Sequence, residues 1–294
     1  MMSLVRVEMR RFTSRRAVRA IMAVVLLGVI LGSVLTFLHS NRNFSAATAR
    51  ERARAAAEYQ GCLRDVRAGN DIGEGGKCIE PDLAAVHADP RFHLKALTDV
   101  LGNLSGSLIV LGLALGATFV GAEWHHRTMT VELTWNSRRV RVGLAKIGAC
   151  AAVVFGGALA MQLLLSAGLV PAAVLRGATD GTTGAWLAGT IGVGIRGALV
   201  AGLAASMGAA LAMLVRSTAV AIGIFFVWLS VLEGILRQLR PGWRSWLIGN
   251  NTAGFVTGGT DASRSELASG ILLLLYAAAL AWVSLVSFRR RDLA

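Results

Sequence analysis

The chain lacks the short motifs that would give it catalytic chemistry of its own. It has no G-x-x-x-x-G-K-[ST] loop for a nucleotide, no H-E-x-x-H for a catalytic zinc ion and no G-x-S-x-G elbow for a serine hydrolase. Gly192, Gly194 and Gly197 do match G-x-G-x-x-G, but they lie inside an apolar stretch, where glycines favour helix packing over dinucleotide binding. We therefore expect a chain that is not an enzyme and that carries no cofactor or metal.

Charged residues are also scarce, at 16% of the sequence, and the gaps between them leave six long apolar stretches. About 20 apolar residues of helix cross the hydrocarbon core of a bilayer. Each stretch must be helical, because lipid offers the backbone no other hydrogen-bonding partner. The sequence predicts an all-α polytopic membrane protein with six transmembrane helices, at Ala20–Leu38, Val100–Ala122, Ile147–Leu175, Trp186–Val215, Ser217–Leu236 and Leu267–Phe288.

Lysine and arginine are sorted by side. One side of these stretches carries 15 basic and four acidic residues, and the other carries 14 basic and 12 acidic ones. Nine of each on the second side lie in one loop that is too long to weigh much in the positive-inside rule. The asymmetry predicts a cell-membrane protein with both termini in the cytoplasm. The net charge of +13 then serves contact with membrane lipid, and we expect no nucleic-acid binding.

Three further segments of this single transmembrane domain have their own patterns. Residues 1–19 alternate basic and apolar positions, which predicts an amphipathic helix on the inner leaflet. Residues 39–99 form the long extracytoplasmic loop, and good helix formers occupy its first part, 46–59. Residues 239–266 combine few charges with two tryptophans, which favours short re-entrant or interfacial helices.

The chain has only three cysteines. Cys150 begins the third apolar stretch and is expected to pack in the interior. Cys62 and Cys78 share the long outer loop, which faces an oxidising compartment in the predicted topology. A disulfide between them would close a loop of about 17 residues and contribute about 3 kcal/mol. Two free thiols remain the alternative.

Two ionisable residues fall inside the apolar stretches. Arg196 lies in the fourth and Glu233 near the end of the fifth. Charges buried in a membrane are costly, and they usually pair with each other or face water. Consecutive antiparallel helices could bring these two side chains together. A structural ion pair and a role in a substrate path are both compatible with the sequence.

The most specific pattern lies between the second and third stretches. This cytoplasmic connection, 123–146, mixes apolar and basic positions, as a surface that docks a partner or lies on a membrane would. Its main features, with the glycine before it, are Gly121-Ala122-Glu123, then Thr128 to Thr134 including Glu132, then Ser137-Arg138-Arg139-Val140-Arg141, and finally Leu144-Ala145-Lys146.

This segment resembles the second cytoplasmic region of type-2 ABC exporter permeases. The family pattern is roughly G-x-E, G-T, a leucine-rich turn, P-x-S-R and a lysine where the third span begins. The C-terminal Phe288-Arg289-Arg290-Arg291-Asp292-Leu293 is similar to the family's ending, an aromatic residue followed by R-x-D. Arg127 stands where the family usually has glycine, and Asn136 where it often has proline.

The resemblance implies the membrane half of an exporter. Two permease chains, as two copies or as paralogues, would pair above two separate ABC ATPase subunits, which would bind the ATP and Mg²⁺. The connection would supply the coupling helix, with Glu123, Thr128, Glu132, Arg138 and Arg141 as its contact residues. The substrate would be hydrophobic or amphipathic.

Two other classes of function are open at this stage. A membrane sensor or scaffold would signal from the loop with Cys62 and Cys78 to a cytoplasmic partner. An ion-coupled transporter would need acidic residues within the membrane, and Glu233 alone is available.

Overall fold

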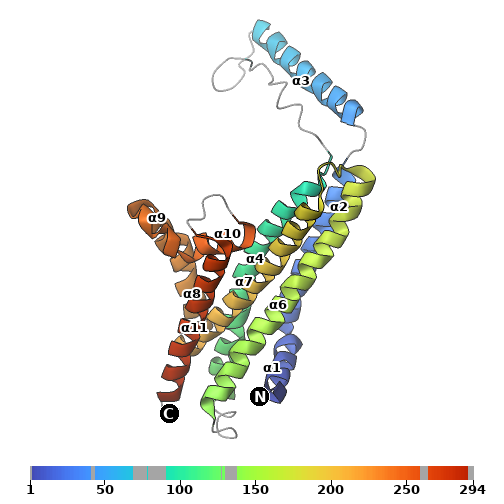
Figure 1. The fold of residues 1–294 in the computed structure, drawn as a ribbon. Helices are drawn as coiled ribbons and strands as arrows, with labels where there is room; N and C mark the ends of the chain where they lie inside the picture. The colour runs from blue at the N-terminus through green and yellow to red at the C-terminus, as the bar shows by residue number, and fades with distance from the viewer. Residues whose placement is uncertain are drawn as a thin grey trace. The chain divides into compact units, whose positions relative to one another are not determined.

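The computed structural model describes residues 2–40, 44–68, 78, 91–126, 128–129, 138–258 and 264–290. Within these ranges the chain is built from helices and forms no strand (Figure 1). Six helical stretches are long and apolar enough to cross a membrane: Arg16–His39, Leu94–His125, Arg139–Arg176, Gly184–Val215, Thr218–Leu239 and Glu266–Arg290. The predicted all-α, multi-pass membrane protein is confirmed, and each stretch overlaps one of the six predicted spans.

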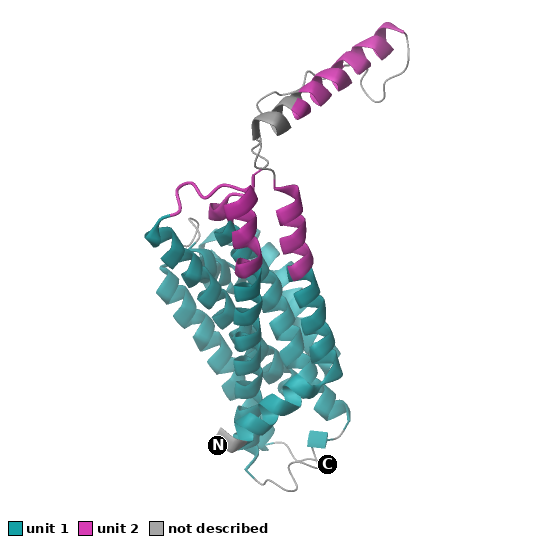
Figure 2. Cartoon of the chain, turned by 90° about the vertical axis from the view of Figure 1, so that its right-hand side faces the viewer, with its two compact units in different colours: residues 1–29, 97–165, 183–294 teal, residues 30–96, 166–182 magenta. Residues whose placement is uncertain are grey.

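The chain divides into two compact units (Figure 2). The larger comprises residues 1–29, 97–165 and 183–294, and the smaller comprises residues 30–96 and 166–182. The larger unit holds α1 (Met2–Ser14), the first part of α2 (Arg16–His39), α4 (Leu97–His125), most of α6 (Arg139–Pro171), α7 (Gly184–Val215), α8 (Thr218–Val227), η4 (Trp228–Leu232), α9 (Glu233–Leu239), η5 (Pro241–Trp246), α10 (Ile248–Thr257) and α11 (Glu266–Arg290).

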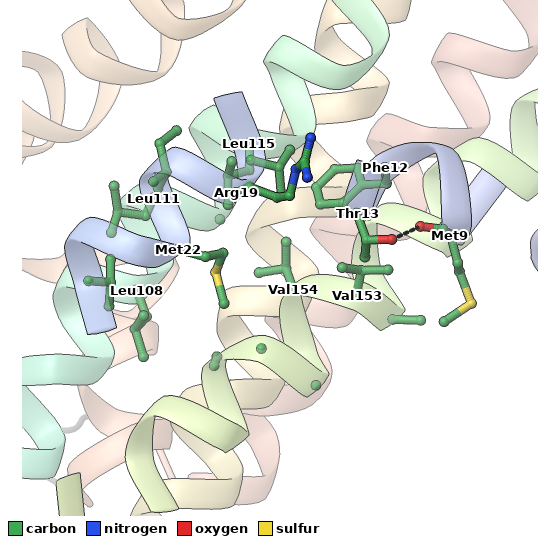
Figure 3. Close-up of a pocket in the computed structure, with 18 residues that line it drawn as sticks. Met9, Phe12, Thr13, Arg19, Met22, Leu108, Leu111, Leu115, Val153 and Val154 are labelled. Carbon is green, nitrogen blue, oxygen red and sulfur yellow. Dashed lines mark hydrogen bonds between the residues drawn. The ribbon is translucent and has the colours of Figure 1, made fainter. Parts of the chain in front are cut away.

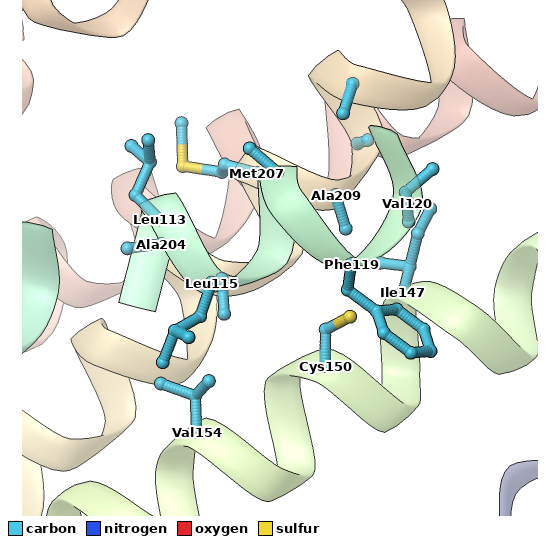
Figure 4. Packing of buried hydrophobic residues seen from close by; sticks show 14 of the residues in the cluster. Leu113, Leu115, Phe119, Val120, Ile147, Cys150, Val154, Ala204, Met207 and Ala209 are labelled. Carbon is cyan, nitrogen blue, oxygen red and sulfur yellow. The ribbon is translucent and has the colours of Figure 1, made fainter. Parts of the chain in front are cut away.

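The core of the larger unit is the contact between α4 and α7. A Cβ at Gly116 would collide with the backbone of Ala205, and one at Gly208 would collide with the backbone of Leu113. Small residues let the backbones of two membrane helices come into direct contact. This close approach maximises van der Waals contact where no hydrophobic effect drives association. Leu115, Phe119 and Cys150 pack in the same cluster (Figure 4), so the interior position predicted for Cys150 is confirmed.

The turn between α7 and α8 is tight, as the lone charge between the fourth and fifth stretches suggests. Arg216 ends α7 in the left-handed backbone region, with φ of 55°. Ser217 then caps α8, because its hydroxyl accepts a hydrogen bond from the amide of Val220 at 3.4 Å. The fifth span is less regular than predicted, since a π-helical turn, η4, separates α8 from α9.

The predicted 1–19 helix is divided in the structure. The first helix ends at Ser14, and α2 begins at Arg16. Phe12 and Val18 are 0% and 6% exposed, so the protein itself covers part of the apolar face that we assigned to the membrane, while Val7 stays 50% exposed. The segment 239–266 contains the two short helices η5 and α10, in agreement with the prediction of short helices.

The smaller unit contains the end of α2, α3 (Phe44–Arg67), η2 (Leu94–Ala96) and the π-helical turn η3 (Ala172–Arg176), which follows Pro171. Ser40 Oγ donates to the carbonyl of Arg176 at 3.0 Å and accepts from the amide of Phe92 at 3.0 Å. Cys62 and Cys78 form a disulfide, which decides between the two alternatives left open. The helix predicted over 46–59 is part of α3.

Candidate functional site

A cluster of charged side chains, three of them buried, joins α1, the break before α2, α4 and α6 of the larger unit. Glu8 comes from α1, Arg15 from the break before α2, Glu123 from the end of α4 and Lys146 from the beginning of α6. We call these four residues the charge cluster. Glu123 and Lys146 are the first and last residues of the predicted coupling connection, so the cluster holds both of its ends.

Lys146 is the centre of the cluster. Its Nζ lies 3.1 Å from Glu8 Oε2 and 2.8 Å from Glu123 Oε2. Arg15 Nη2 donates to Glu123 Oε1 at 2.9 Å, and Arg11 Nη1 donates to Glu8 Oε1 at 3.1 Å. Each carboxylate therefore has two basic partners. The arrangement holds α1 against the ends of α4 and α6 by charge-assisted hydrogen bonds, which are stronger than neutral ones.

These contacts are important for the fold because three of the four charged side chains are buried. Lys146 is 0% exposed, Glu8 1% and Glu123 6%. A buried ion pair contributes little net stability relative to apolar residues, but removal of one partner leaves an uncompensated charge. The cluster therefore specifies one arrangement of the four elements rather than adding much to overall stability.

Aromatic contacts support the cluster. Phe12 of α1 and Phe119 of α4 pack with ring centroids 4.9 Å apart. The guanidinium of Arg15 lies 4.3 Å from the centre of the Phe119 ring and also donates to the Phe119 carbonyl at 2.9 Å. A guanidinium over an aromatic face gains electrostatic attraction when it is partly desolvated. These contacts fix the position of Arg15 even though part of its side chain is open to solvent.

The other side of the α4 terminus is held by a second set of rings. Trp124 packs edge-on against Phe288 of α11, with centroids 6.0 Å apart. The guanidinium of Arg216, in the α7–α8 turn, lies 4.7 Å from the centre of the Trp124 ring. The end of α4 thus contacts α1 and α6 through charges, and α11 and the α7–α8 turn through aromatic packing.

Among the residues predicted for coupling, one is buried, three are exposed and one is not described by the structure. Glu123 is buried in the charge cluster, where it pairs with Arg15 before α2 and with Lys146 of α6. Thr128 is exposed and donates to the Glu123 carbonyl at 3.3 Å. Arg138 and Arg141 are exposed at the start of α6, where they line an open hollow with Arg139 and with Arg289 of α11. Glu132 lies outside the described residues.

The predicted ion pair between Arg196 and Glu233 is wrong. Arg196 of α7 pairs instead with Glu266 at the start of α11. Glu233 is 1% exposed and accepts from backbone amides of Ile248 at 2.8 Å and Gly249 at 2.9 Å, and from Trp228 Nε1 at 3.2 Å. The chain folds back after α9 and places the first amides of α10 against the carboxylate.

Glu233 therefore caps the N-terminus of α10, although it lies outside that helix in the sequence. The first amides of a helix have no partner within it, and a carboxylate there is stabilised by the helix dipole. Hydrogen bonds to a charged group contribute about 1.5–3 kcal/mol. We expect Glu233→Ala to lower the free energy of unfolding by about 2 kcal/mol. Hydrogen exchange should show the amides of Ile248 and Gly249 losing protection first.

A matched variant, Glu266→Ala, removes a half-exposed carboxylate from the start of another helix in the same unit. It should leave exchange at Ile248 and Gly249 unchanged. Equal loss of protection in both variants would contradict the capping role of Glu233.

Three members of the charge cluster, Glu8, Arg15 and Lys146, were not among the predicted site residues. Glu8 is the only acidic residue among the first 50, and this isolation within a basic segment is a signal that sequence reasoning could have used. Lys146 was grouped with the cytoplasmic basic residues, but its ammonium group is buried. The packing of α1 and of the end of α4 beside the start of α6 brings the two carboxylates to it.

Within the described part of the chain, no group of three or more His, Cys, Asp or Glu residues could hold a metal ion. No family model matches the sequence, and the comparisons with characterised proteins and with solved structures find no match either.

Proposed function

We propose that the chain is the membrane-spanning permease of an ATP-driven exporter of the ABC type, working with separate ATPase subunits. It would reside in the cell membrane with both termini in the cytoplasm, and a second permease copy or a paralogue would complete the pore. The ATP and Mg²⁺ would be bound by the ATPase subunits. The chain's own part would be to carry substrate and to transmit motion.

The observation that carries this proposal is the charge cluster. An ATPase that moves the 123–146 connection must move the ends of α4 and α6. Glu123 and Lys146 lie at those ends and are joined to Glu8 and Arg15, so α1 has to follow. Mechanical coupling needs such a rigid junction, because a packed, hydrogen-bonded group moves as one body.

The exposed arginines supply the second support. Arg138 just before α6, Arg141 of α6 and Arg289 of α11 surround one hollow that opens to solvent. In the proposed topology this hollow faces the cytoplasm. Complementary charge orients partners during docking, so an ATPase that seats here would present acidic side chains.

The substrate class follows from the walls of the bundle. The six candidate spans are apolar, and the ion pairs described within them lie near helix ends: Arg196 with Glu266 at the start of α11, and Lys146 with Glu123 near the end of α4. Such walls suit a hydrophobic or amphipathic molecule rather than an ion.

The proposal is tested by charge reversal of Arg138 and Arg141 to Glu together. We expect the double variant to insert normally but to lose its ATPase partner, because both side chains are exposed and neither supports the fold. Purification of the tagged chain in mild detergent, with mass spectrometry of bound proteins, measures this. The wild type should recover a stoichiometric protein with a Walker A motif, and the variant at least tenfold less of it.

The matched control is Arg240→Glu with Arg244→Glu, two exposed arginines in and before η5. This variant should retain the ATPase. Recovery of wild type without any ATPase, from membranes shown to contain the chain, would overturn the proposal and favour a sensor or scaffold that uses the disulfide-bonded outer segment.

A further inference from the structure

An apolar groove runs between α2, α4 and α6 in the larger unit (Figure 3). Its volume is about 470 Å³, within the range of small-molecule sites. Met22 of α2, Leu108 and Leu115 of α4, and Val153 and Val154 of α6 form its walls. Thr13 and Arg19 are the polar side chains among the lining residues of this described region.

Small residues on α6 make the groove. A Cβ added at Gly156 would meet nothing within 4 Å, and one at Gly157 would meet the flexible end of Met22. Ala152 and Ala158 continue the same wall. Larger side chains at these positions would fill the space, so their absence keeps the groove open along α6.

The groove has one polar end. Arg19 is exposed, and its side chain makes no hydrogen bond or ion pair within the described part of the chain. The Thr13 hydroxyl donates to the carbonyls of Met9 and Arg10, which leaves its oxygen as an acceptor only. Of these two polar side chains, only the Arg19 guanidinium can therefore donate to or pair with an anionic ligand.

The position of that cation in the membrane is set by α2. Arg19 lies in the first turn of a membrane-spanning helix, and Val25 lines the groove six residues deeper, about 9 Å at the helical rise. The groove thus starts where lipid headgroups lie and extends into the level of their acyl chains. This holds whichever side of the membrane the N-terminus occupies.

We propose that this groove binds one anionic phospholipid, with an acyl chain between α2, α4 and α6 and its phosphate on the Arg19 guanidinium. Two properties select this occupant. The walls exclude a polar molecule, because nothing in them would replace its lost hydration. The cation at the headgroup level favours a phosphate with net negative charge over a zwitterionic headgroup. The proposal does not depend on the exporter function.

The test is native mass spectrometry of the full chain released from nanodiscs that contain phosphatidylglycerol and phosphatidylcholine in equal amounts. We expect the wild type to retain one phosphatidylglycerol in preference to phosphatidylcholine. Arg19→Ala should lower that preference about fivefold, which corresponds to about 1 kcal/mol per basic residue near an anionic surface. Arg16→Ala, an exposed arginine that does not line the groove, should lower it much less.

The acyl-chain site is tested by Gly156→Leu. The leucine should fill the groove and reduce retained lipid of both kinds, whereas Gly148→Leu is the control. Gly148 lies on the same helix, has equal space for a side chain and is outside the groove. Thermal unfolding shows whether both leucine variants remain folded. Arg19→Ala changes an exposed residue, so it tests the proposal even if a leucine variant fails to fold.

Equal retention of the two lipids by the wild type would overturn the proposal and would leave the groove to a neutral ligand such as a transported amphiphile. Unchanged lipid preference in Arg19→Ala, or unchanged retention in a folded Gly156→Leu, would overturn it as well.

Discussion

Replacement of Lys146 by Met is expected to lower the free energy of unfolding by about 3 kcal/mol, the lower end of the range for breaking a buried ion pair. The ammonium group is 0% exposed and lies between the carboxylates of Glu8 and Glu123. Without it, two buried negative charges face each other, with Arg11 and Arg15 as their remaining partners. Those arginines keep the loss below the upper end of the range. Denaturant unfolding followed by circular dichroism measures the effect.

The control is Arg141→Met, which removes an exposed basic residue from the same end of α6 and should change stability by less than about 0.5 kcal/mol. A double variant, Glu123→Gln with Lys146→Met, should lose less than the sum of the two single losses, since the two residues share one contact. Strict additivity, or a Lys146→Met variant as stable as Arg141→Met, would refute the central role assigned to Lys146.

Substitution of Gly116 by Leu is expected to cost about 3 kcal/mol, the upper part of the range for overpacking. A Cβ at this position would already overlap the backbone of Ala205 on α7, and backbone cannot move aside as a flexible side chain can. The two helices would have to separate and lose the close packing that holds them together in lipid. The melting temperature in detergent should fall accordingly.

Gly106→Leu is the matched control on the same helix. A Cβ there would meet nothing within 4 Å, and leucine favours helix over glycine by about 0.5–1 kcal/mol. Its melting temperature should therefore equal or exceed that of the wild type. If the two leucine variants melt at the same temperature, the close approach of α4 and α7 is not what stabilises the bundle.

The helices could be predicted from the sequence because a bilayer leaves few choices. An uncharged stretch of about 20 residues can satisfy its backbone in lipid only as a helix, so local composition decides the outcome. The short turn at Arg216 and the helix over 46–59 are equally local, since they depend on neighbouring residues alone. The pairing of Cys62 with Cys78 needed the structure to decide between two alternatives.

The partners of the buried charges could not be predicted in the same way. Arg196 and Glu233 are separated by one helical hairpin, which made a pair between them reasonable, yet Arg196 pairs with Glu266 and Glu233 caps α10. The direction in which each side chain points depends on helix rotation and on the π-helical turn η4, and neither is encoded in hydropathy. Glu8 shows the same limit, since its buried partner Lys146 is 138 positions away.

By itself, therefore, the sequence determined that this is an all-helical multi-pass membrane protein, and where each span runs. Hydrophobicity and length are properties of the local sequence, and the lipid bilayer requires such a stretch to be a helix. The tertiary structure alone decided which polar groups meet: the charge cluster that joins α1 to both ends of the 123–146 connection, the carboxylate that caps α10, and the groove that ends at Arg19. Those contacts depend on how the helices pack against one another. Gly116 and Gly208 allow the close packing of α4 and α7, because a Cβ at either position would collide with the backbone of the other helix.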